Sequence, residues 1–452
     1  MRTLFISPMV SRRYMDHVEA LARKGWGEAR FVARDVKRHE RHVKRVFYGL
    51  GLLTLASSLP PGIPFAFVDE NLEKNDPTPL YEKGDYDLVA LTGQVIQRRR
   101  MLELMDFFSA RGVHVVVGGV HATGFPEDYM RKGASVVVGE GEELFPAFLK
   151  DFARGKPLPL YKSSSPAGID PGRWPSPDYS LLSSYRYNLV GVQTTRGCPY
   201  RCDYCQVSRV LGDRYRHKPV ERVGEEVRAV KRHWPDAMFY FFDDNLFADR
   251  YYALELLENL RDVDLGPWGA HADVSVSRDP ELLDRIVANG APSLAIGFET
   301  LSPRNALRLG NPMKSRMLPE YDEAVARLGD KGVRVAGSFM FGFPGDSEEE
   351  LEEILSFVRR HGIKGYITRY SAIPGSKMYD DLVSDYRKEK GEFSEKGTPL
   401  ARKINEFFME RNGFGFRETE DMILQALKKA YTHRLPLSQL DALAVFRSFF
   451  TE

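Results

Sequence analysis

Short runs of β-branched and apolar residues recur along this chain with helical stretches between them, and this alternation constrains the fold most strongly. In the first part of the sequence the runs are TLFIS, PFAFV, DLVALTG, VHVVVGG and ASVVVGE, and MLELMDFFSARG is one of the helical stretches. Runs of this kind are typical of parallel strands that are buried on both faces and joined by covering helices. Residues 1–155 are therefore expected to form a doubly wound α/β domain.

The same alternation returns after a stretch rich in Pro, Ser and Gly, residues 156–185, which is typical of a linker. About six strand-helix units follow, from LVGVQTT to GYITRYSAI. This pattern predicts a partial (β/α)6 barrel over residues 186–384, with its active site at the carboxyl ends of the strands.

The last part of the chain, residues 385–452, changes to amphipathic helices. The segments ARKINEFFMERN, ETEDMILQALKKAYTH and SQLDALAVFRSFF place apolar residues at helical spacing. We expect a small helical cap whose core contains Phe407, Phe408, Phe449 and Phe450, since aromatic residues at this spacing are more often core than substrate contacts.

The charge balance argues against nucleic-acid binding, and the hydropathy pattern argues against a transmembrane segment. The 452 residues carry 64 basic and 63 acidic side chains, so no overall positive charge marks a nucleic-acid-binding protein. Residues 46–68 are uncharged, but Pro60, Pro61 and Pro64 interrupt them. We therefore expect a buried helix that ends near Ser58 and a strand PFAFV, and no transmembrane segment.

All three cysteines of the chain, Cys198, Cys202 and Cys205, lie within the stretch TTRGCPYRCDYCQVS. An odd number of cysteines does not make a closed disulfide framework. A zinc site would need a fourth ligand, and the nearest candidate, His217, lies twelve residues on without a ligand spacing. Three thiolates can hold three irons of a 4Fe-4S cluster and leave the fourth iron open. We prefer this cluster over zinc or over three structural cysteines.

The spacing CxxxCxxC, with an aromatic residue before the last cysteine, resembles the signature of the radical S-adenosylmethionine (SAM) enzymes. The resemblance extends over CPYRCDYCQVSRVLGDRYRHKPVERVGEEV. It implies that Cys198, Cys202 and Cys205 bind the cluster, that SAM chelates the fourth iron, and that Tyr204 lies against the adenine. It also implies reductive cleavage of SAM to a 5'-deoxyadenosyl radical, with electrons from a flavodoxin- or ferredoxin-type donor. Thiolate ligands further suggest a reducing, cytoplasmic location.

Polar residues follow several predicted barrel strands, where this family binds SAM. Asp243, which we prefer to Asp244, follows MFYFF, and a carboxylate there suits the methionyl ammonium of SAM. Ser275 is a candidate for a ribose or carboxylate contact. By the same resemblance, Gly297 would allow close approach of the adenine and Glu299 would lie near SAM.

The front domain resembles the cobalamin-binding domain that precedes the barrel in the cobalamin-dependent subclass of these enzymes. The resemblance rests on VVVGGVHAT followed by VVVGEGEELF. In parallel sheets ligands bind beyond the carboxyl ends of the strands, and glycines there let the backbone approach a ligand. The expected cofactor-binding residues lie at three such strand ends: Thr92, Gly93 and Gln94, then Gly118, Gly119, His121 and Ala122, then Gly139, Glu140, Gly141 and Glu142.

One familiar cobalamin motif, DxHxxG after the first strand, is missing. Asp16 and His17 are adjacent, and no glycine follows at the right distance. We therefore expect no histidine ligation of cobalt through that motif. His121 could contact the corrin or the nucleotide tail, or it could satisfy backbone groups in a tight turn.

Together these resemblances predict a cobalamin-dependent radical SAM enzyme that methylates an unactivated carbon, with a 4Fe-4S cluster, SAM and cobalamin as cofactors. The expected substrate is a small molecule, including natural-product or lipid-like compounds. Three alternatives stay open: a non-methylating radical cyclisation, rearrangement or carbon-carbon coupling; a cobalamin sensor or electron-transfer iron-sulfur protein; and a front domain that no longer binds cobalamin.

Overall fold

A computed structural model describes residues 1–8, 46–47, 49–72, 86–94, 97–163, 168–391, 400–411 and 422. The chain forms two compact units, the first made of Met1–Arg196 with Val210–Tyr240 and the second of Gly197–Arg209 with Phe241–Glu452. Asp16, His17, Phe449 and Phe450 lie outside the described residues, as do the last two predicted helices apart from Met422. Across the described ranges, no helix is long and apolar enough to span a membrane.

The first unit contains a six-stranded parallel sheet in the order β2-β1-β3-β4-β5-β6. All five strands predicted for this part are confirmed, and the predicted helix before Ser58 is α3. The strands are β1 (Thr3–Ser7), β2 (Phe65–Asp69), β3 (Leu88–Thr92), β4 (His114–Gly118), β5 (Ser135–Val138) and β6 (Leu160–Lys162); the helices are α3 (Leu50–Ser57), α5 (Arg98–Ser109), α6 (Gly119–Gly124), α7 (Pro126–Met130) and α8 (Gly141–Ala153).

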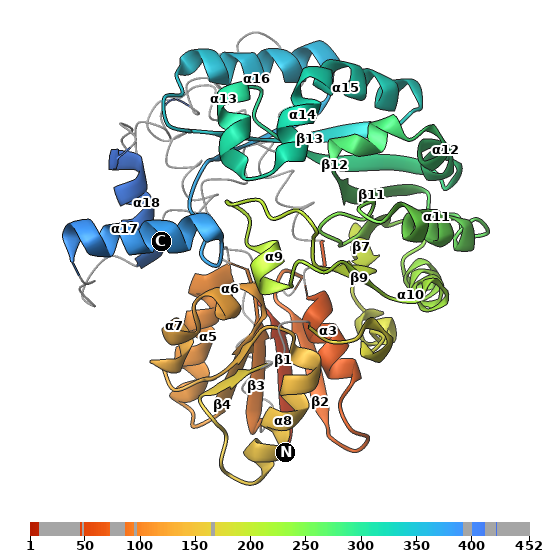
Figure 1. Cartoon of the computed structure of the whole chain (residues 1–452). Coiled ribbons are helices and arrows are strands. Elements are labelled where there is room, and N and C mark those ends of the chain that lie inside the picture. Colours follow the sequence, from red (N-terminus) through yellow and green to blue (C-terminus); the bar gives the residue numbers. More distant parts are fainter. Residues whose placement is uncertain are drawn as a thin grey trace, which may run out of the picture. The chain divides into compact units, whose positions relative to one another are not determined.

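Both faces of this sheet are buried, which explains why its strands are apolar at successive positions. Val115 and Val117 of β4 belong to one core with residues of α5 and α7, whereas Val116 between them belongs to a second core with residues of α3 and α8. Figure 1 shows α5 and α7 on one side of this sheet and α3 and α8 on the other. The doubly wound prediction is confirmed.

The stretch expected to be a linker contains regular structure. Its residues Leu160–Lys162 form β6, which pairs in parallel with β5. Two short 3-10 turns follow, at Pro171–Arg173 and Tyr179–Leu182. The segment LPLYK was not predicted as a strand, because this edge strand buries only one of its three residues and so shows no apolar run.

The first unit also contains the elements that flank the cysteine segment in the chain. Strands β8 (Thr195–Arg196) and β9 (Arg216–His217) form a short antiparallel pair in which Arg196 lies opposite Arg216. The three cysteines fall between these two strands in sequence. The remaining elements here are β7 (Leu189–Val192), β10 (Met238–Phe241) and α10 (Val220–His233).

The second unit continues the alternation of strands and helices. Strands β11, β12, β13 and β14 pair in parallel in this order, with a register irregularity between Gly297 and Glu299. With β7 and β10, all six strands predicted for the barrel are present. The strands are β11 (Pro267–Ala272), β12 (Ala291–Glu299), β13 (Arg334–Phe341) and β14 (Lys364–Arg369); the helices are α9 (Val207–Val210), α11 (Arg250–Asn259), α12 (Pro280–Ala288), α13 (Pro303–Ala306), α14 (Pro312–Met317), α15 (Tyr321–Asp330), α16 (Glu348–His361), α17 (Lys377–Lys390) and α18 (Leu400–Arg411).

Local sequence signals set the ends of these helices, and α16 is an example. Ser347 and Glu350 form a reciprocal capping box at its start, and Gly362 ends it in the left-handed conformation. The loop between β13 and α16 is held by a side chain: the Asp346 carboxylate accepts the backbone N–H groups of Gly342 and Phe343 at 3.0 and 2.9 Å.

The predicted helix ARKINEFFMERN is α18. Phe407 and Phe408 are buried in a core with residues of α17 and Tyr370, which confirms that they are core residues. Helix α17 begins at Lys377.

Candidate functional site

The three cysteines are free thiols in the segment between β8 and α9. Cys202 is buried and the other two are partly buried. Burial raises the pKa of the Cys198 thiol to about 11 and that of Cys205 to about 12, and the charge of the neighbouring cysteines contributes to both shifts. The three sulfur atoms therefore lie within electrostatic reach of one another.

The donor set, three thiols on one segment, is of the kind that holds an iron-sulfur cluster. Within the described ranges, no three Cys, His, Asp or Glu side chains converge as ligands of one metal ion. A cluster does not need such convergence, because each thiolate binds a different iron. The raised pKa values of Cys198 and Cys205 mean that cluster binding must displace protons from these thiols.

The cysteine segment is fixed by residues from distant parts of the second unit. The Asp203 backbone N–H donates to the Leu309 carbonyl at 3.0 Å, and the Asp203 carbonyl accepts the Met378 N–H at 2.8 Å. Gly310 has φ +69°, and a Cβ there would lie 2.5 Å from Asp203 Oδ1. The close approach and the positive φ both require glycine at this position.

Tyr204, Gly297 and Glu299, which were predicted to contact SAM, lie together with a lysine that the sequence did not reveal. Lys314 Nζ lies 3.3 Å from Glu299 Oε1 and also donates to the Gly297 carbonyl. Glu299 has φ +69°, the only non-glycine residue of the described part with a positive φ. Tyr204 hydrogen-bonds to Glu299, and burial is the first cause of its raised pKa. Glu299 thus has its charge partner inside the protein.

The two carboxylates after β10 differ in exposure. Asp243 is buried, whereas Asp244 is exposed. Surrounding protein atoms nevertheless remove enough water to raise the pKa of Asp244 to about 7, and the charge of Asp243 adds to this shift. The Asp244 carboxylate in turn contributes to the raised pKa of Cys198 and of Cys205, so it lies within electrostatic reach of both.

Asp273 connects the cysteine segment to two strand ends. Its Oδ2 accepts the Asn245 amide at 2.8 Å and the Tyr200 hydroxyl at 3.2 Å, and its Oδ1 accepts the Ser275 backbone N–H at 2.8 Å. The Ser275 side chain also hydrogen-bonds to Tyr200. The predicted residue Ser275 therefore faces the cysteine segment, beside an aspartate that the sequence analysis missed.

In the first unit, the predicted glycine-rich edge is open at some positions and tightly packed at others. Gly119 has φ +88°, and a Cβ there would lie 2.3 Å from Thr92 Oγ1. A Cβ on Gly93 would lie 2.5 Å from Met101 Sδ, while one on Gly118 would make ordinary contacts with Val137. Gly139 has φ +94° and open space around it, and Gln94 is exposed. A ligand at this edge would therefore meet mainly backbone.

His121 and Ala122 point into the protein. Ala122 is fully buried in the core beside α5. His121 is buried, stacks on Phe125, and has its Nδ1 2.7 Å from the Tyr129 hydroxyl. Burial, followed by the charge of Arg98, lowers the pKa of His121 to about 4, which keeps its ring neutral. The His121 ring is thus held by side chains, Tyr129 and Phe125, and its predicted contact with cobalamin stays a prediction.

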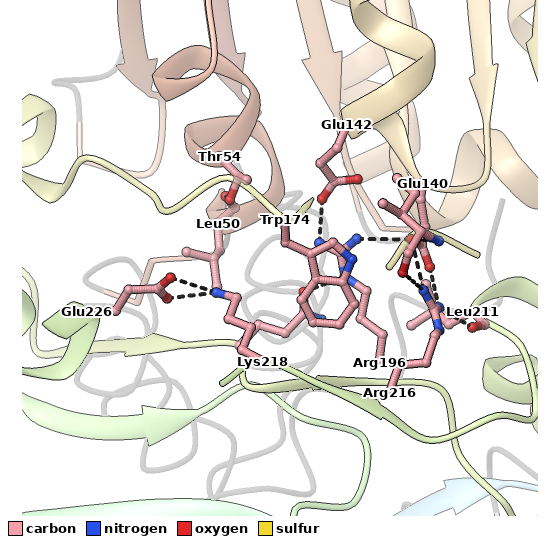
Figure 2. A network of polar contacts seen from close by, with 12 residues as sticks. Leu50, Thr54, Glu140, Glu142, Trp174, Arg196, Leu211, Arg216, Lys218 and Glu226 are labelled. Carbon is pink, nitrogen blue, oxygen red and sulfur yellow. Dashed lines mark hydrogen bonds and ion pairs between the residues drawn. The ribbon is translucent and has the colours of Figure 1, made fainter. Parts of the chain in front are cut away.

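The acidic residues after β5 bind two arginines (Figure 2). Glu140 Oε2 lies 3.4 Å from Arg196 Nη1, and the Glu140 carboxylate forms a bidentate pair with Arg216. Glu142 Oε1 lies 2.5 Å from Arg196 Nη2. The guanidinium of Arg196 lies over the Trp174 ring, 4.4 Å from its centroid. Burial alone would raise the pKa of Glu140, but the two arginines bring it below its usual value. Glu140 and Glu142 are thus internally paired.

Comparison with known proteins agrees with this arrangement. Residues 41–149 match the model of the B12 binding domain, and residues 192–358 match that of the radical SAM superfamily. Relatives include a bacteriochlorophyllide d C-12(1)-methyltransferase of Chlorobaculum tepidum, 27% identical over 75% of this chain and 74% of the relative, and a hopanoid C-2 methylase of Rhodopseudomonas palustris, 25% identical over 75% and 64%. The methyltransferase TsrM of Kitasatospora setae, solved with cobalamin and a [4Fe-4S] cluster, matches 88% of this chain and 82% of its own with a TM-score of 0.67 at 15% identity.

The chain belongs to the radical SAM enzymes that carry a B12 binding domain. A 4Fe-4S cluster, SAM and cobalamin are therefore the cofactors of this enzyme. The likeness to TsrM shows a shared fold, a parallel α/β front domain followed by the radical SAM domain.

The sequence pattern alone did not reveal the roles of five residues, Asp273, Asn311, Lys314, Arg196 and Arg216. Asp273 and Asn311 each precede a short helical turn as side-chain caps, so their sequence signal is indistinguishable from that of an ordinary helix start. Arg196 and Arg216 lie on either side of the cysteine segment in the sequence. This position could have indicated that they pair with the acidic residues after β5.

Proposed function

We propose that this enzyme transfers a methyl group from SAM, by way of cobalamin, to an unactivated carbon of a small-molecule substrate. The observation that carries the proposal is the group of three free, mutually interacting thiols on one segment, which suits a cluster with an open iron. When bound, the cofactors supply the one-electron cleavage of SAM and a methyl carrier, while the chain binds and orients them and excludes water.

Within the second unit, Cys198, Cys202 and Cys205 would hold three irons of the cluster. Of the two carboxylates after β10, we now assign Asp244 to the ammonium of SAM, because it is exposed and acts electrostatically on two of the cysteines. An ammonium would favour the ionised form of this carboxylate. Tyr204, Ser275, Gly297 and Glu299 remain proposed SAM contacts, and Asp273 would orient the first part of the cysteine segment through Tyr200.

Within the first unit, cobalamin would contact the backbone at the ends of β3, β4 and β5. The open position at Gly139 and the exposed Gln94 support this assignment. Glu140 and Glu142 support it less, since their carboxylates are paired with arginines. The proposed domains are residues 1–155 for cobalamin, 186–384 for SAM and 385–452 for the helical cap.

The names of two relatives support the proposed substrate class. One relative is named for bacteriochlorophyllide and another for hopanoid, and both compounds are small molecules. We therefore propose a substrate of natural-product or lipid-like character and not a nucleic acid. A flavodoxin- or ferredoxin-type protein would supply electrons, in a cytoplasmic setting that keeps the thiols reduced.

An anaerobic assay tests the proposal. The purified chain is reconstituted with iron, sulfide and hydroxocobalamin and incubated with SAM and dithionite, and mass spectrometry follows 5'-deoxyadenosine and S-adenosylhomocysteine. Both products, with one cobalamin bound per chain, are expected. The matched control replaces Cys198, Cys202 and Cys205 by alanine, which should abolish the cluster and 5'-deoxyadenosine while cobalamin binding remains.

Other results would redirect the proposal. Deoxyadenosine without S-adenosylhomocysteine from a cobalamin-loaded enzyme would favour a non-methylating radical reaction. Deoxyadenosine without bound cobalamin would mean a front domain that no longer binds it. An intact cluster that gives neither product would contradict radical SAM catalysis and favour a sensor or electron carrier.

A further inference from the structure

One side-chain amide, that of Asn311, donates a hydrogen bond directly to a cysteine sulfur. Its Nδ2 lies 3.4 Å from Cys202 Sγ, and both residues are buried. This distance is normal for a donor to sulfur, which is larger than oxygen. Asn311 lies far from Cys202 in the chain, so the contact exists only in the folded protein.

The amide is held in this orientation by its other end. Asn311 Oδ1 accepts the Met313 backbone N–H at 3.0 Å, as the side-chain cap of α14. Only the oxygen of the amide can accept this N–H, so the NH2 group must be the atom that faces sulfur. The cap therefore fixes a donor, and not an acceptor, against Cys202.

The other two cysteines receive their donors differently. Cys198 and Cys205 are hydrogen-bonded by backbone N–H groups, those of Tyr200 and Val207 respectively. These donors cannot be removed by substitution of a side chain. Cys202 instead receives hydrogen bonds from two side chains, a stronger one from Asn311 and a weaker one from Tyr204. Lys314 is a nearby cation.

We propose that Asn311 is a positioning residue that raises the reduction potential of the cluster through its hydrogen bond to Cys202. The inference rests on the proposed role of Cys202 as a cluster ligand. Reduction adds one electron from an external low-potential donor and leaves all ligands in place, so the reduced cluster is more negative than the oxidised one. A fixed N–H donor stabilises the more negative state more, and hydrogen bonds to sulfur are a known determinant of cluster potentials.

The test uses substitutions that keep an oxygen for the helix cap and remove the amide NH2 group that reaches Cys202. Asn311→Ser and Asn311→Thr retain a side-chain oxygen for the Met313 N–H. Asn311→Asp retains the cap and places a carboxylate against the sulfur. Asp249→Ser is the matched control, because Asp249 is also a cap residue of the second unit, bonded to the Tyr251 and Tyr252 N–H groups.

The reconstituted full-length enzyme is titrated against redox dyes without SAM, and the reduced cluster is counted by electron paramagnetic resonance. At a fixed potential, the ratio of reduced to oxidised cluster should fall about three- to tenfold in Asn311→Ser and Asn311→Thr, where tenfold corresponds to about 59 mV for one electron. Asn311→Asp should lower the ratio further, and Asp249→Ser should leave it unchanged.

Three outcomes would overturn the inference. Titration curves of Asn311→Ser and Asn311→Thr that coincide with the wild type, at equal iron and sulfide content, would show that the hydrogen bond does not set the potential. Equal shifts in Asp249→Ser would assign the effect to helix capping. Loss of the cluster from both variants would make Asn311 a residue for assembly and not for tuning. A wild-type chain that takes up no cluster would instead contradict the proposed function itself.

Discussion

Replacement of Glu140 by glutamine is expected to destabilise the first unit by about 3 kcal/mol, because it removes one of two carboxylates that neutralise two buried arginines. The side chains of Glu140 and Glu142 are 7% exposed, and those of Arg196 and Arg216 are 10% exposed. Glutamine keeps the size of the side chain. The cost therefore measures charge and not packing.

The magnitude follows from the partners that remain. Breaking a buried ion pair by removing one partner costs about 3–5 kcal/mol. Arg196 would keep Glu142, so the unpaired charge would fall on Arg216. Arg216 still donates to the Ile169 and Leu211 carbonyls at 2.8 and 2.7 Å, which places the cost at the lower end of that range.

Thermal unfolding of the full chain measures this effect. A loss of about 3 kcal/mol should lower the Tm of the affected transition by roughly 6–12 °C for a unit of this size. Glu143→Gln is the matched control, because Glu143 pairs with Arg173 at 2.7 Å on the surface, where such a pair contributes about 1 kcal/mol or less.

A double-mutant cycle isolates the pair. Arg216→Gln combined with Glu140→Gln should cost less than the sum of the two single variants, since neither charge is then left alone. Equal Tm values for Glu140→Gln and Glu143→Gln, or strict additivity in the cycle, would refute the reasoning that this network is a buried charge balance.

Three further predictions concern other parts of the chain. Asp69 is fully buried and has a pKa of about 6, so its contribution to stability is present below about pH 4 and is lost as the pH rises through about 6. In Asp69→Asn, the free energy of unfolding measured in urea should fall by about 3 kcal/mol less over this pH range than it does in the wild type. An unchanged pH dependence would contradict this. Phe407→Ala should cost about 3–5 kcal/mol in urea unfolding and expose α18 to proteolysis, because Phe407 is buried; an unchanged unfolding midpoint would contradict this. Gly119→Ala should destabilise the first unit more than Gly139→Ala in urea, because both have positive φ but only Gly119 would contact Thr92; equal effects would exclude the clash.

Much of the fold could be predicted because it depends on local patterns. The five apolar runs of the front domain form five strands, and successive residues of each strand pack against opposite cores. The edge strand β6 escaped prediction because an edge position buries too few residues to leave a pattern. The short caps at Asp273 and Asn311 looked like ordinary helix starts for a different reason: their chemical neighbours are distant in sequence.

The sequence by itself determined the chemistry that is available: three cysteines at fixed spacing, a parallel α/β pattern, and glycine-rich strand ends. It could not determine which polar groups are already satisfied. Only the tertiary structure decided that Glu140 and Glu142 neutralise Arg196 and Arg216, and that the Asn311 amide faces Cys202. The physical reason is that a charge or a hydrogen-bond donor is defined by its partner, and these partners come together only when distant segments pack.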